Sequence, residues 1–320
     1  MSIEAGMTIG EYEMESALMN AGGLVKSVED VRLMAATAVG AVLAGSYTIE
    51  PRAGNSPNGE VVYYHDSLTG GTYNALGMPN KGLVEVAANL NEMIDIAHDH
   101  GKPFILNFAP VTSDPRAEVM LLAEILADAK VETLDAIELN ASCPNVITED
   151  GSRKELLSHH PGLLGEVLHE LSDIGVTRVP FETLMVRISP FRRQADAVGL
   201  AQVVRDTFTN VVSAFNTFPG GVPLDATGRQ ILQVPGGAGG RSGAAMTCIA
   251  EEQTIWLANA RDTIGGDFDI VGSNGVVDGA SMKRRLELGA SAVSATTAFW
   301  EARSWGEAAN TILQEYAALI

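Results

Sequence analysis

The sequence has few cysteines and no long hydrophobic run, and each absence excludes a class of protein. Only Cys143 and Cys248 occur among 320 residues, so at most one disulfide can form and a disulfide-stabilised scaffold is excluded. The longest apolar stretch, residues 33–45, is interrupted by Thr37 and is shorter than the roughly 20 residues that a membrane-spanning helix needs. The first residues lack the basic region and apolar run of a signal peptide, so we expect a cytoplasmic protein with no membrane segment.

Positive charge is also scarce. Lys and Arg number 21 against 40 Asp and Glu, which gives a net charge of −19, and only six of the cations are lysine. Such a chain repels nucleic acids and anionic membranes, so we expect neither as a partner. A small anionic ligand is not excluded, because it responds to the local field. The apolar content of 46% is too high for a disordered chain.

Short β-like runs alternate with amphipathic helical stretches along the whole chain. This pattern predicts an α/β fold, a single (β/α)8 TIM barrel domain over residues 1–320. The expected strands are residues 14–19, 41–47, 103–108, 136–140, 184–188, 210–216, 268–271 and 291–295. A long polar loop is expected at 48–80, after the second strand, and a glycine-rich loop at 217–243, after the sixth. Between these segments we expect helices at 27–37, 83–98, from 113, 161–173, 196–206, 244–260, 278–288 and from 298, with Ser27, Asp114 and Asp278 as N-caps.

Polar residues, many of them asparagine, follow nearly every predicted strand. At any single position they simply mark where a strand ends, but in a barrel all these ends meet at one rim, where catalysis takes place. Asparagine offers both a donor and an acceptor, which suits a planar ring with N–H and C=O groups. The glycines at 236–243 and after the seventh strand suit a phosphate. Neither a dinucleotide-binding G-x-G-x-x-G after a strand nor a P-loop is present.

Several segments resemble the dihydroorotate dehydrogenase family. The most specific is E-L-N-A-S-C-P-N at residues 138–145, and N-A-L-G-M-P-N at 74–80 and G-G-R-S-G at 239–243 resemble two further family segments. The segments M-N-A-G-G at 19–23 and E-P-R-A-G-N at 50–55 also occur in the family's order. The resemblance extends from about residue 17 to 300.

The resemblance implies an FMN-binding (β/α)8 barrel that oxidises dihydroorotate to orotate. A base removes a proton from C5 of the substrate while a hydride passes from C6 to flavin N5. Cys143 stands at the base position, where the soluble class of the family has cysteine, and a thiol serves only if its site favours deprotonation. The usual role of an isolated cysteine is a buried core residue, and Cys248 is interpreted in that way.

The resemblance also implies two sets of binding residues. The substrate set is Asn74, Gly77, Met78, Asn140, Asn145, Asn216 and Thr217. The cofactor set is Ala21, Gly22, Ser46, Asn107, Asn140 and Arg187 around the flavin rings, with Gly243, Asn274, Gly275, Thr296 and Thr297 at the phosphate. The six histidines show no spacing expected for a metal site.

Four positions depart from the family pattern. Gly45 replaces a lysine that contacts flavin and the substrate carboxylate, Arg187 replaces a second lysine, and Asn274 and Thr296 replace glycines. Arg187 keeps the charge but presents it differently.

Gly45 leaves three alternatives. Another cation, such as Arg52 or Lys81, reaches the site; the substrate is a related cyclic amide without the carboxylate; or the chain is a flavin-binding homologue that has lost activity.

The electron acceptor is not readable from the sequence. By the resemblance, soluble members act as homodimers that reduce fumarate, or transfer electrons to NAD through an electron-transfer subunit with an iron–sulfur cluster. We expect a homodimer, and two cysteines are too few for a cluster within this chain.

Overall fold

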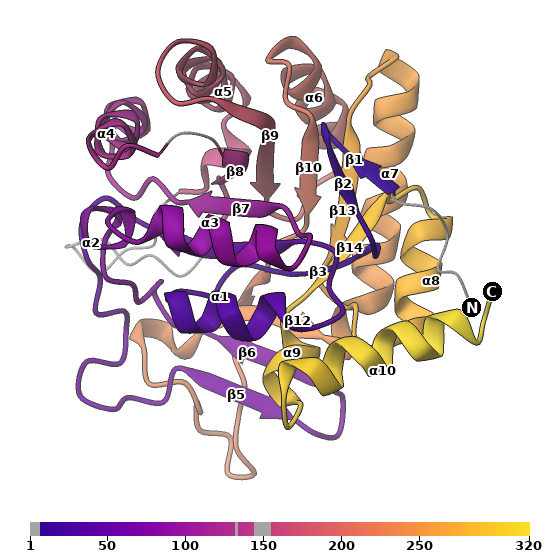
Figure 1. Ribbon diagram of the computed structural model, residues 1–320. Coiled ribbons are helices and arrows are strands. Elements are labelled where there is room, and N and C mark those ends of the chain that lie inside the picture. The colour runs from indigo at the N-terminus through magenta and orange to yellow at the C-terminus, as the bar shows by residue number, and fades with distance from the viewer. Residues whose placement is uncertain (1–6, 132–133, 144–154) are drawn as a thin grey trace.

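Eight parallel strands form the centre of the molecule (Figure 1). The computed structural model describes residues 7–131, 134–143 and 155–320. The strands are hydrogen-bonded in the order β3-β14-β13-β10-β9-β8-β7-β4. Their bounds are β3 (Leu18–Asn20), β4 (Val42–Tyr47), β7 (Phe104–Phe108), β8 (Leu134–Asn140), β9 (Phe181–Ile188), β10 (Val211–Ala214), β13 (Asp269–Ser273) and β14 (Ala292–Ala295). Strands β4 and β7 are buried at every residue, as expected for a sheet covered on both faces.

The two ends of this strand order, β3 and β4, also meet. Asn20 at the end of β3 donates from Nδ2 to the Leu43 carbonyl at 2.7 Å and accepts from the Leu43 N–H at 3.0 Å. The Gly40 N–H donates to the Leu18 carbonyl at 2.7 Å. The side-chain amide of Asn20 therefore replaces part of the backbone hydrogen bonding between β3 and β4. Because these contacts close the barrel, the predicted (β/α)8 fold is confirmed.

Helices cover the outside of the barrel between successive strands (Figure 1). They are α1 (Val28–Ala35), α2 (Leu83–Ala87), α3 (Leu90–Asp99), α4 (Pro115–Asp128), α5 (Pro161–Thr177), α6 (Gln194–Asp206), α7 (Thr247–Ile264), α8 (Gly279–Glu287), α9 (Thr297–Glu301) and α10 (Trp305–Ala317), with 3₁₀ turns at Leu157–His159, Pro235–Gly237 and Ala244–Met246. The predicted N-caps are confirmed: Ser27, Asp114 and Asp278 accept from the third N–H of their helices at 3.2, 3.1 and 2.7 Å. The single helix expected at 83–98 is divided into α2 and α3.

The prediction of a first barrel strand at residues 14–19 is wrong for the first half of that range. Met14 belongs to a hairpin of β1 (Met7–Ile9) and β2 (Tyr12–Met14), and the barrel strand begins only at Leu18. The hairpin closes the N-terminal end of the barrel, where the Gly10 N–H donates to Asp269 Oδ2 at 2.8 Å. Its apolar side chains join those of the barrel interior in one buried cluster. Met14 is therefore as buried as a barrel residue, and hydrophobicity alone does not separate the two strands.

Both predicted loops contain strands. The loop at 48–80 holds β5 (Tyr63–Asp66) and β6 (Gly71–Asn74), and the loop at 217–243 holds β11 (Phe218–Gly221) and β12 (Gly239–Gly243). These strands form a separate antiparallel sheet in the order β11-β12-β6-β5. The pairing of β12 with β6 joins segments about 170 residues apart, which no local pattern reveals. The hairpin of β5 and β6 is local, but its short polar strands lack the alternating apolar pattern of a predicted strand.

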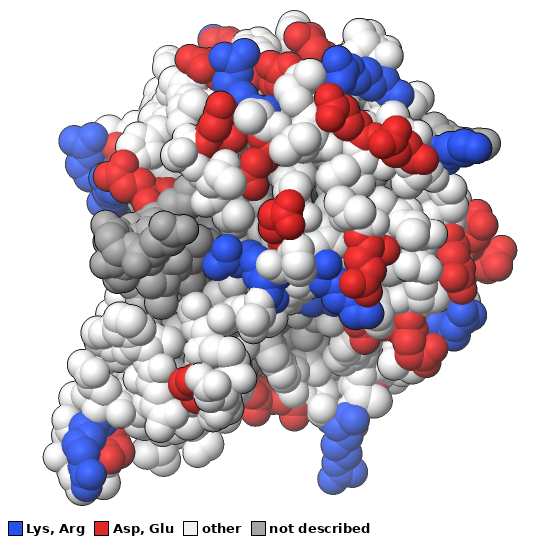
Figure 2. Space-filling model, turned by 90° about the vertical axis from the view of Figure 1, so that its left-hand side faces the viewer, with Lys and Arg blue, Asp and Glu red and all other residues white. Residues whose placement is uncertain are grey.

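Charge is unevenly distributed over the surface. On the face in Figure 2, Lys and Arg side chains lie among Asp and Glu side chains over the barrel helices, while the lower part of the face is mainly uncharged. That lower part is at the level of β5 and β12 in Figure 1.

Candidate active site

A cavity of about 300 Å³ opens at the C-terminal end of the barrel, between the strand ends and the separate sheet. This volume is at the lower end of the range for small-molecule sites. Most of the residues assigned by resemblance line it: Ala21, Gly22, Ser46, Asn74, Gly77, Met78, Asn140, Cys143, Arg187, Asn216, Thr217, Asn274, Gly275, Thr296 and Thr297. The chain thus gathers residues from nearly 300 positions of sequence around one space.

Three assigned residues are not among those that line the cavity. Asn107 is fully buried beneath it and donates from Nδ2 to Glu138. Gly243 ends β12 next to Ser242, which does line the cavity. Asn145 lies outside the described residues. The roles expected for these three residues, like those of the lining residues, stay predictions.

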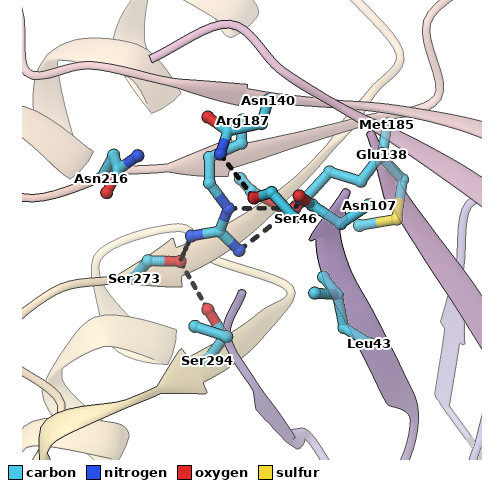
Figure 3. Close-up of polar contacts among 12 residues, drawn as sticks. Leu43, Ser46, Asn107, Glu138, Asn140, Met185, Arg187, Asn216, Ser273 and Ser294 are labelled. Carbon is cyan, nitrogen blue, oxygen red and sulfur yellow. Dashed lines mark hydrogen bonds and ion pairs between the residues drawn. The ribbon is translucent and has the colours of Figure 1, made fainter. Parts of the chain in front are cut away.

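Ser142 fixes the orientation of two asparagines at the cavity. Its N–H and Oγ donate to Asn140 Oδ1 at 3.2 and 3.1 Å, and its carbonyl and Oγ accept from Asn216 Nδ2 at 3.2 and 3.1 Å. Asn140 Nδ2 also donates to Ser46 Oγ at 2.8 Å (Figure 3). The two amides, from the ends of β8 and of β10, are held in place before any ligand arrives, which lowers the entropic cost of binding.

Arg187 is neutralised by a buried carboxylate. Its Nε and Nη2 donate to the two oxygens of Glu138 at 3.0 and 3.2 Å, and both side chains are buried (Figure 3). Strand register explains the pairing: Met185 lies opposite Glu138, and Arg187, two residues further along the same face of β9, reaches Glu138 diagonally. Two of its five N–H donors are used on Glu138 and a third on Ser273 Oγ at 3.5 Å, so Arg187 brings only the remaining donors and little net charge to the cavity floor.

Cys143 is a half-buried thiol on the cavity wall and is not in a disulfide. It follows Ser142 directly, so the hydrogen bonds that position the asparagines also fix its backbone. The nearby ammonium group of Lys26 interacts electrostatically with Cys143. A cation close to a thiol favours the thiolate, which is the reactive form. Cys248, by contrast, is exposed at the start of α7, so its interpretation as a core residue is wrong.

The cation that reaches the cavity is Lys26, not Arg52 or Lys81. Lys81 is 69% exposed and pairs with Glu85 at 2.9 Å. Arg52 donates from Nε to the Gly77 carbonyl at 3.2 Å and is not among the lining residues. Lys26 lines the cavity and donates from Nζ to the Pro79 carbonyl at 2.5 Å. Burial lowers its pKa.

Hydroxyl groups gather at the far end of the cavity. Thr72 Oγ1 lies 2.6 Å from Ser242 Oγ and 3.2 Å from Thr297 Oγ1. The adjacent turn after β13 has Asn274 at φ 64° and is fixed by Arg285, which donates to the carbonyls of Ser273 and Asn274 at 2.8 and 2.9 Å. Arg285 is fully buried, and this burial lowers its pKa to about 10.

Several polar atoms around the cavity await a partner. Among the described residues, Asn107 Oδ1, Thr217 Oγ1 and Asn274 Oδ1 are buried and make no hydrogen bond. Such atoms are costly in a folded protein unless a ligand or water satisfies them. The cavity therefore suits a ligand that is rich in hydrogen-bonding groups.

Two aromatic rings stand at the edge of the cavity. Tyr63 of β5 and Trp300 of α9 are stacked with centroids 5.0 Å apart, and Tyr63 Oη donates to Glu301 at 2.5 Å. Burial and this carboxylate raise the pKa of Tyr63. Trp300 is 41% exposed and lines the cavity.

Sequence reasoning missed Lys26, Ser142, Glu138, Thr72 and Ser242. Glu138 and Ser142 stand inside the E-L-N-A-S-C-P-N segment, so their place in that motif was a usable signal. The positions of Thr72 and Ser242 at the cavity depend on the separate sheet. The position of Lys26 depends on backbone hydrogen bonds between its segment and Gly45. No local sequence pattern reveals either arrangement.

Comparison with known proteins agrees with this architecture. The family model for dihydroorotate dehydrogenase matches residues 5–318. The chain belongs to the dihydroorotate dehydrogenase family. It is therefore an oxidoreductase of the class that acts on CH–CH bonds. Among the described residues, no helix is both long enough and apolar enough to cross a bilayer.

Two relatives carry the name dihydroorotate dehydrogenase B (NAD(+)), catalytic subunit. The one from Geobacillus kaustophilus is 31% identical over 271 residues, which are 84% of this chain and 76% of the relative. The one from Halalkalibacterium halodurans is 31% identical over 260 residues, 81% of this chain and 75% of the relative. The crystal structure of the Eimeria tenella enzyme in complex with ferulenol has the same fold, with a TM-score of 0.74 and 17% identity over 98% of this chain and 84% of that one.

Proposed function

We propose that the chain oxidises dihydroorotate to orotate, with Cys143 as the base and FMN as the bound cofactor. The observation that carries the proposal is the convergence of the Cys143 thiol with the amides of Asn74, Asn140 and Asn216 on one cavity. A dihydropyrimidine ring presents alternating N–H and C=O groups, which such amides match as donors and acceptors.

The thiol and the amides have different roles: the amides orient the substrate and the thiol removes its proton. The amides of Asn140 and Asn216, held by Ser142, orient the ring so that the carbon next to its carbonyl faces Cys143. Cys143 as thiolate removes the proton from that carbon and holds it on Sγ. The Lys26 ammonium favours the thiolate before the reaction.

The cavity has the features that a flavin nucleotide requires. The hydroxyls of Thr72, Ser242 and Thr297 and the turn at Asn274–Gly275 would hold the phosphate, and Arg187 and Ser46 would contact the ring system. FMN, when bound, supplies the acceptor for the two electrons that leave the substrate ring. The unpartnered Asn274 Oδ1 and Thr217 Oγ1 then gain a polar ligand.

Electron transfer to NAD through a partner subunit is part of the proposal. It rests on the names of the relatives, which describe an NAD(+)-linked catalytic subunit. The homodimer and the cytoplasmic location expected from the sequence stay predictions.

Anaerobic mixing of the flavin-loaded protein with dihydroorotate tests the proposal. We expect the flavin absorbance to bleach with dihydroorotate and more slowly with an uncharged dihydropyrimidine. Bleaching with the uncharged ring alone would favour the related cyclic amide as substrate. A bound flavin that neither ring bleaches would make the chain a flavin-binding homologue without this activity.

A further inference from the structure

The space at Gly45 is filled by backbone, not by a side chain. Gly45 has φ 126°, and a Cβ there would lie 2.3 Å from the Asn107 carbonyl oxygen. This conformation disfavours any L side chain, whatever the room around it. With this backbone conformation, position 45 presents no cation to the cavity.

The segment that leads to Lys26 runs directly beside Gly45. The Gly45 N–H donates to the Val25 carbonyl at 2.9 Å, and the Gly23 N–H donates to the Gly45 carbonyl at 2.6 Å. Val25 also forms a parallel bridge with Ala44. The backbone that binds Gly45 on both sides thus brings the next residue, Lys26, to the same corner of the cavity.

No carboxylate of the described residues forms an ion pair with the Lys26 ammonium. The described residues that line the cavity include two cations, Lys26 and Arg187, and no Asp or Glu. Arg187 is paired with Glu138, whereas Lys26 makes no ion pair within the described part of the chain. Asp30 on the same segment accepts from the Lys26 backbone N–H at 2.9 Å, and its carboxylate also interacts electrostatically with the Lys26 ammonium.

The lysine side chain ends beside Gly77 and Met78, which the resemblance assigns to substrate binding. Nζ donates to the Pro79 carbonyl, one residue after Met78, and both Gly77 and Met78 line the cavity with positive φ. Cys143 lies close enough to interact electrostatically with the same ammonium. The Lys26 ammonium therefore contacts the 77–79 segment and also interacts with the Cys143 thiol. Burial lowers the pKa of Lys26, and an anion bound next to it would remove that cost.

We propose that Lys26 binds the carboxylate of the substrate ring and so replaces the cation that Gly45 cannot supply. This inference rests on the proposed function, since it assumes a carboxylated ring. Of the alternatives that Gly45 leaves open, this assignment favours the first: a cation from a neighbouring segment reaches the site, and the substrate keeps its carboxylate.

Binding of the product to the oxidised, flavin-loaded protein tests the assignment without turnover. Orotate and uracil differ by the carboxylate, and their dissociation constants can be measured from the perturbation of the flavin spectrum or by calorimetry. A hydrogen bond to a charged group contributes about 1.5–3 kcal/mol. We therefore expect Lys26→Met to weaken orotate at least about tenfold and to change uracil little. Lys26→Arg should retain much of the orotate preference, and Lys81→Met is the matched surface control with no effect.

The outcomes separate this inference from the proposed function. If dihydroorotate bleaches the flavin but Lys26→Met binds orotate as tightly as the unaltered protein, Lys26 is not the carboxylate site and the function stands. If the unaltered protein binds uracil as tightly as orotate, the assignment is overturned whether or not the flavin is reduced. If orotate is preferred and the preference disappears in Lys26→Met, the assignment holds even when no turnover is seen.

Discussion

At the scale of single residues, the site depends on a few positions whose chemistry admits no close substitute. Ser142 illustrates this: one hydroxyl and one backbone unit orient two asparagines and fix the backbone before Cys143. The same holds for Gly45, where the backbone of Asn107 occupies the place of a side chain.

Gly45→Ala should destabilise the protein by several kcal/mol more than Gly23→Ala. Both glycines have positive φ, at 126° and 106°, so both substitutions incur backbone strain of about 1–3 kcal/mol. Only at Gly45 would the new Cβ collide with backbone, because nothing lies within 4 Å of a Cβ at Gly23. Urea unfolding measures the difference, and equal losses in the two variants would show that the collision is relieved by a small shift.

Glu138→Gln should lower the free energy of unfolding by about 3–5 kcal/mol, because it leaves the buried Arg187 charge without a counter-charge. The matched control is Glu85→Gln, which breaks the exposed pair with Lys81 and should cost less than about 1 kcal/mol. Denaturant titration of both variants checks this. A loss at Glu138 no larger than that at Glu85 would mean that Arg187 is compensated in another way.

At the scale of elements, the sequence predicted the barrel strands because each is a short apolar run that ends in a polar residue. Asn140, Cys143 and Asn216 could be placed at one rim from that alone. Lys26 could not, because its position follows from backbone bonds between the segment after β3 and Gly45. The sheet of β5, β6, β11 and β12 was missed in part for the same reason: the pairing of β6 with β12, which joins its two halves, links distant segments.

Two glycines inside helices should respond to alanine with opposite signs. Gly199 lies within α6 with nothing within 4 Å of a new Cβ, so Gly199→Ala should stabilise the protein by about 0.5–1 kcal/mol through helix propensity. Gly175 lies in α5, where a Cβ would approach the Phe181 ring to 2.7 Å. Gly175→Ala should therefore be destabilising. Thermal unfolding compares the two, and a gain at both positions would contradict the packing of α5 on β9.

At the scale of the whole molecule, the net charge of −19 sets the response to salt. Mutual repulsion among the acidic side chains opposes the compact state, and added salt screens it. Raising NaCl from about 0.05 to 0.5 M at pH 7 should raise the melting temperature by about 2 °C or more, which corresponds to roughly 1 kcal/mol. The control is the same titration near the sequence pI of about 4.6, where the effect should nearly vanish. An equal rise in melting temperature at both pH values would show that salt does not act by screening the acidic side chains.

The central claim for the whole molecule is that the barrel assembles Cys143 as the base of a dehydrogenase. Stopped-flow measurement of anaerobic flavin bleaching by dihydroorotate tests it most directly. We predict that Cys143→Ala slows bleaching by about 10²–10⁴-fold, the usual contribution of a general base, and that Cys248→Ala, at an exposed thiol, leaves the rate unchanged. A Cys143→Ala protein that bleaches at the rate of the unaltered protein would contradict the account.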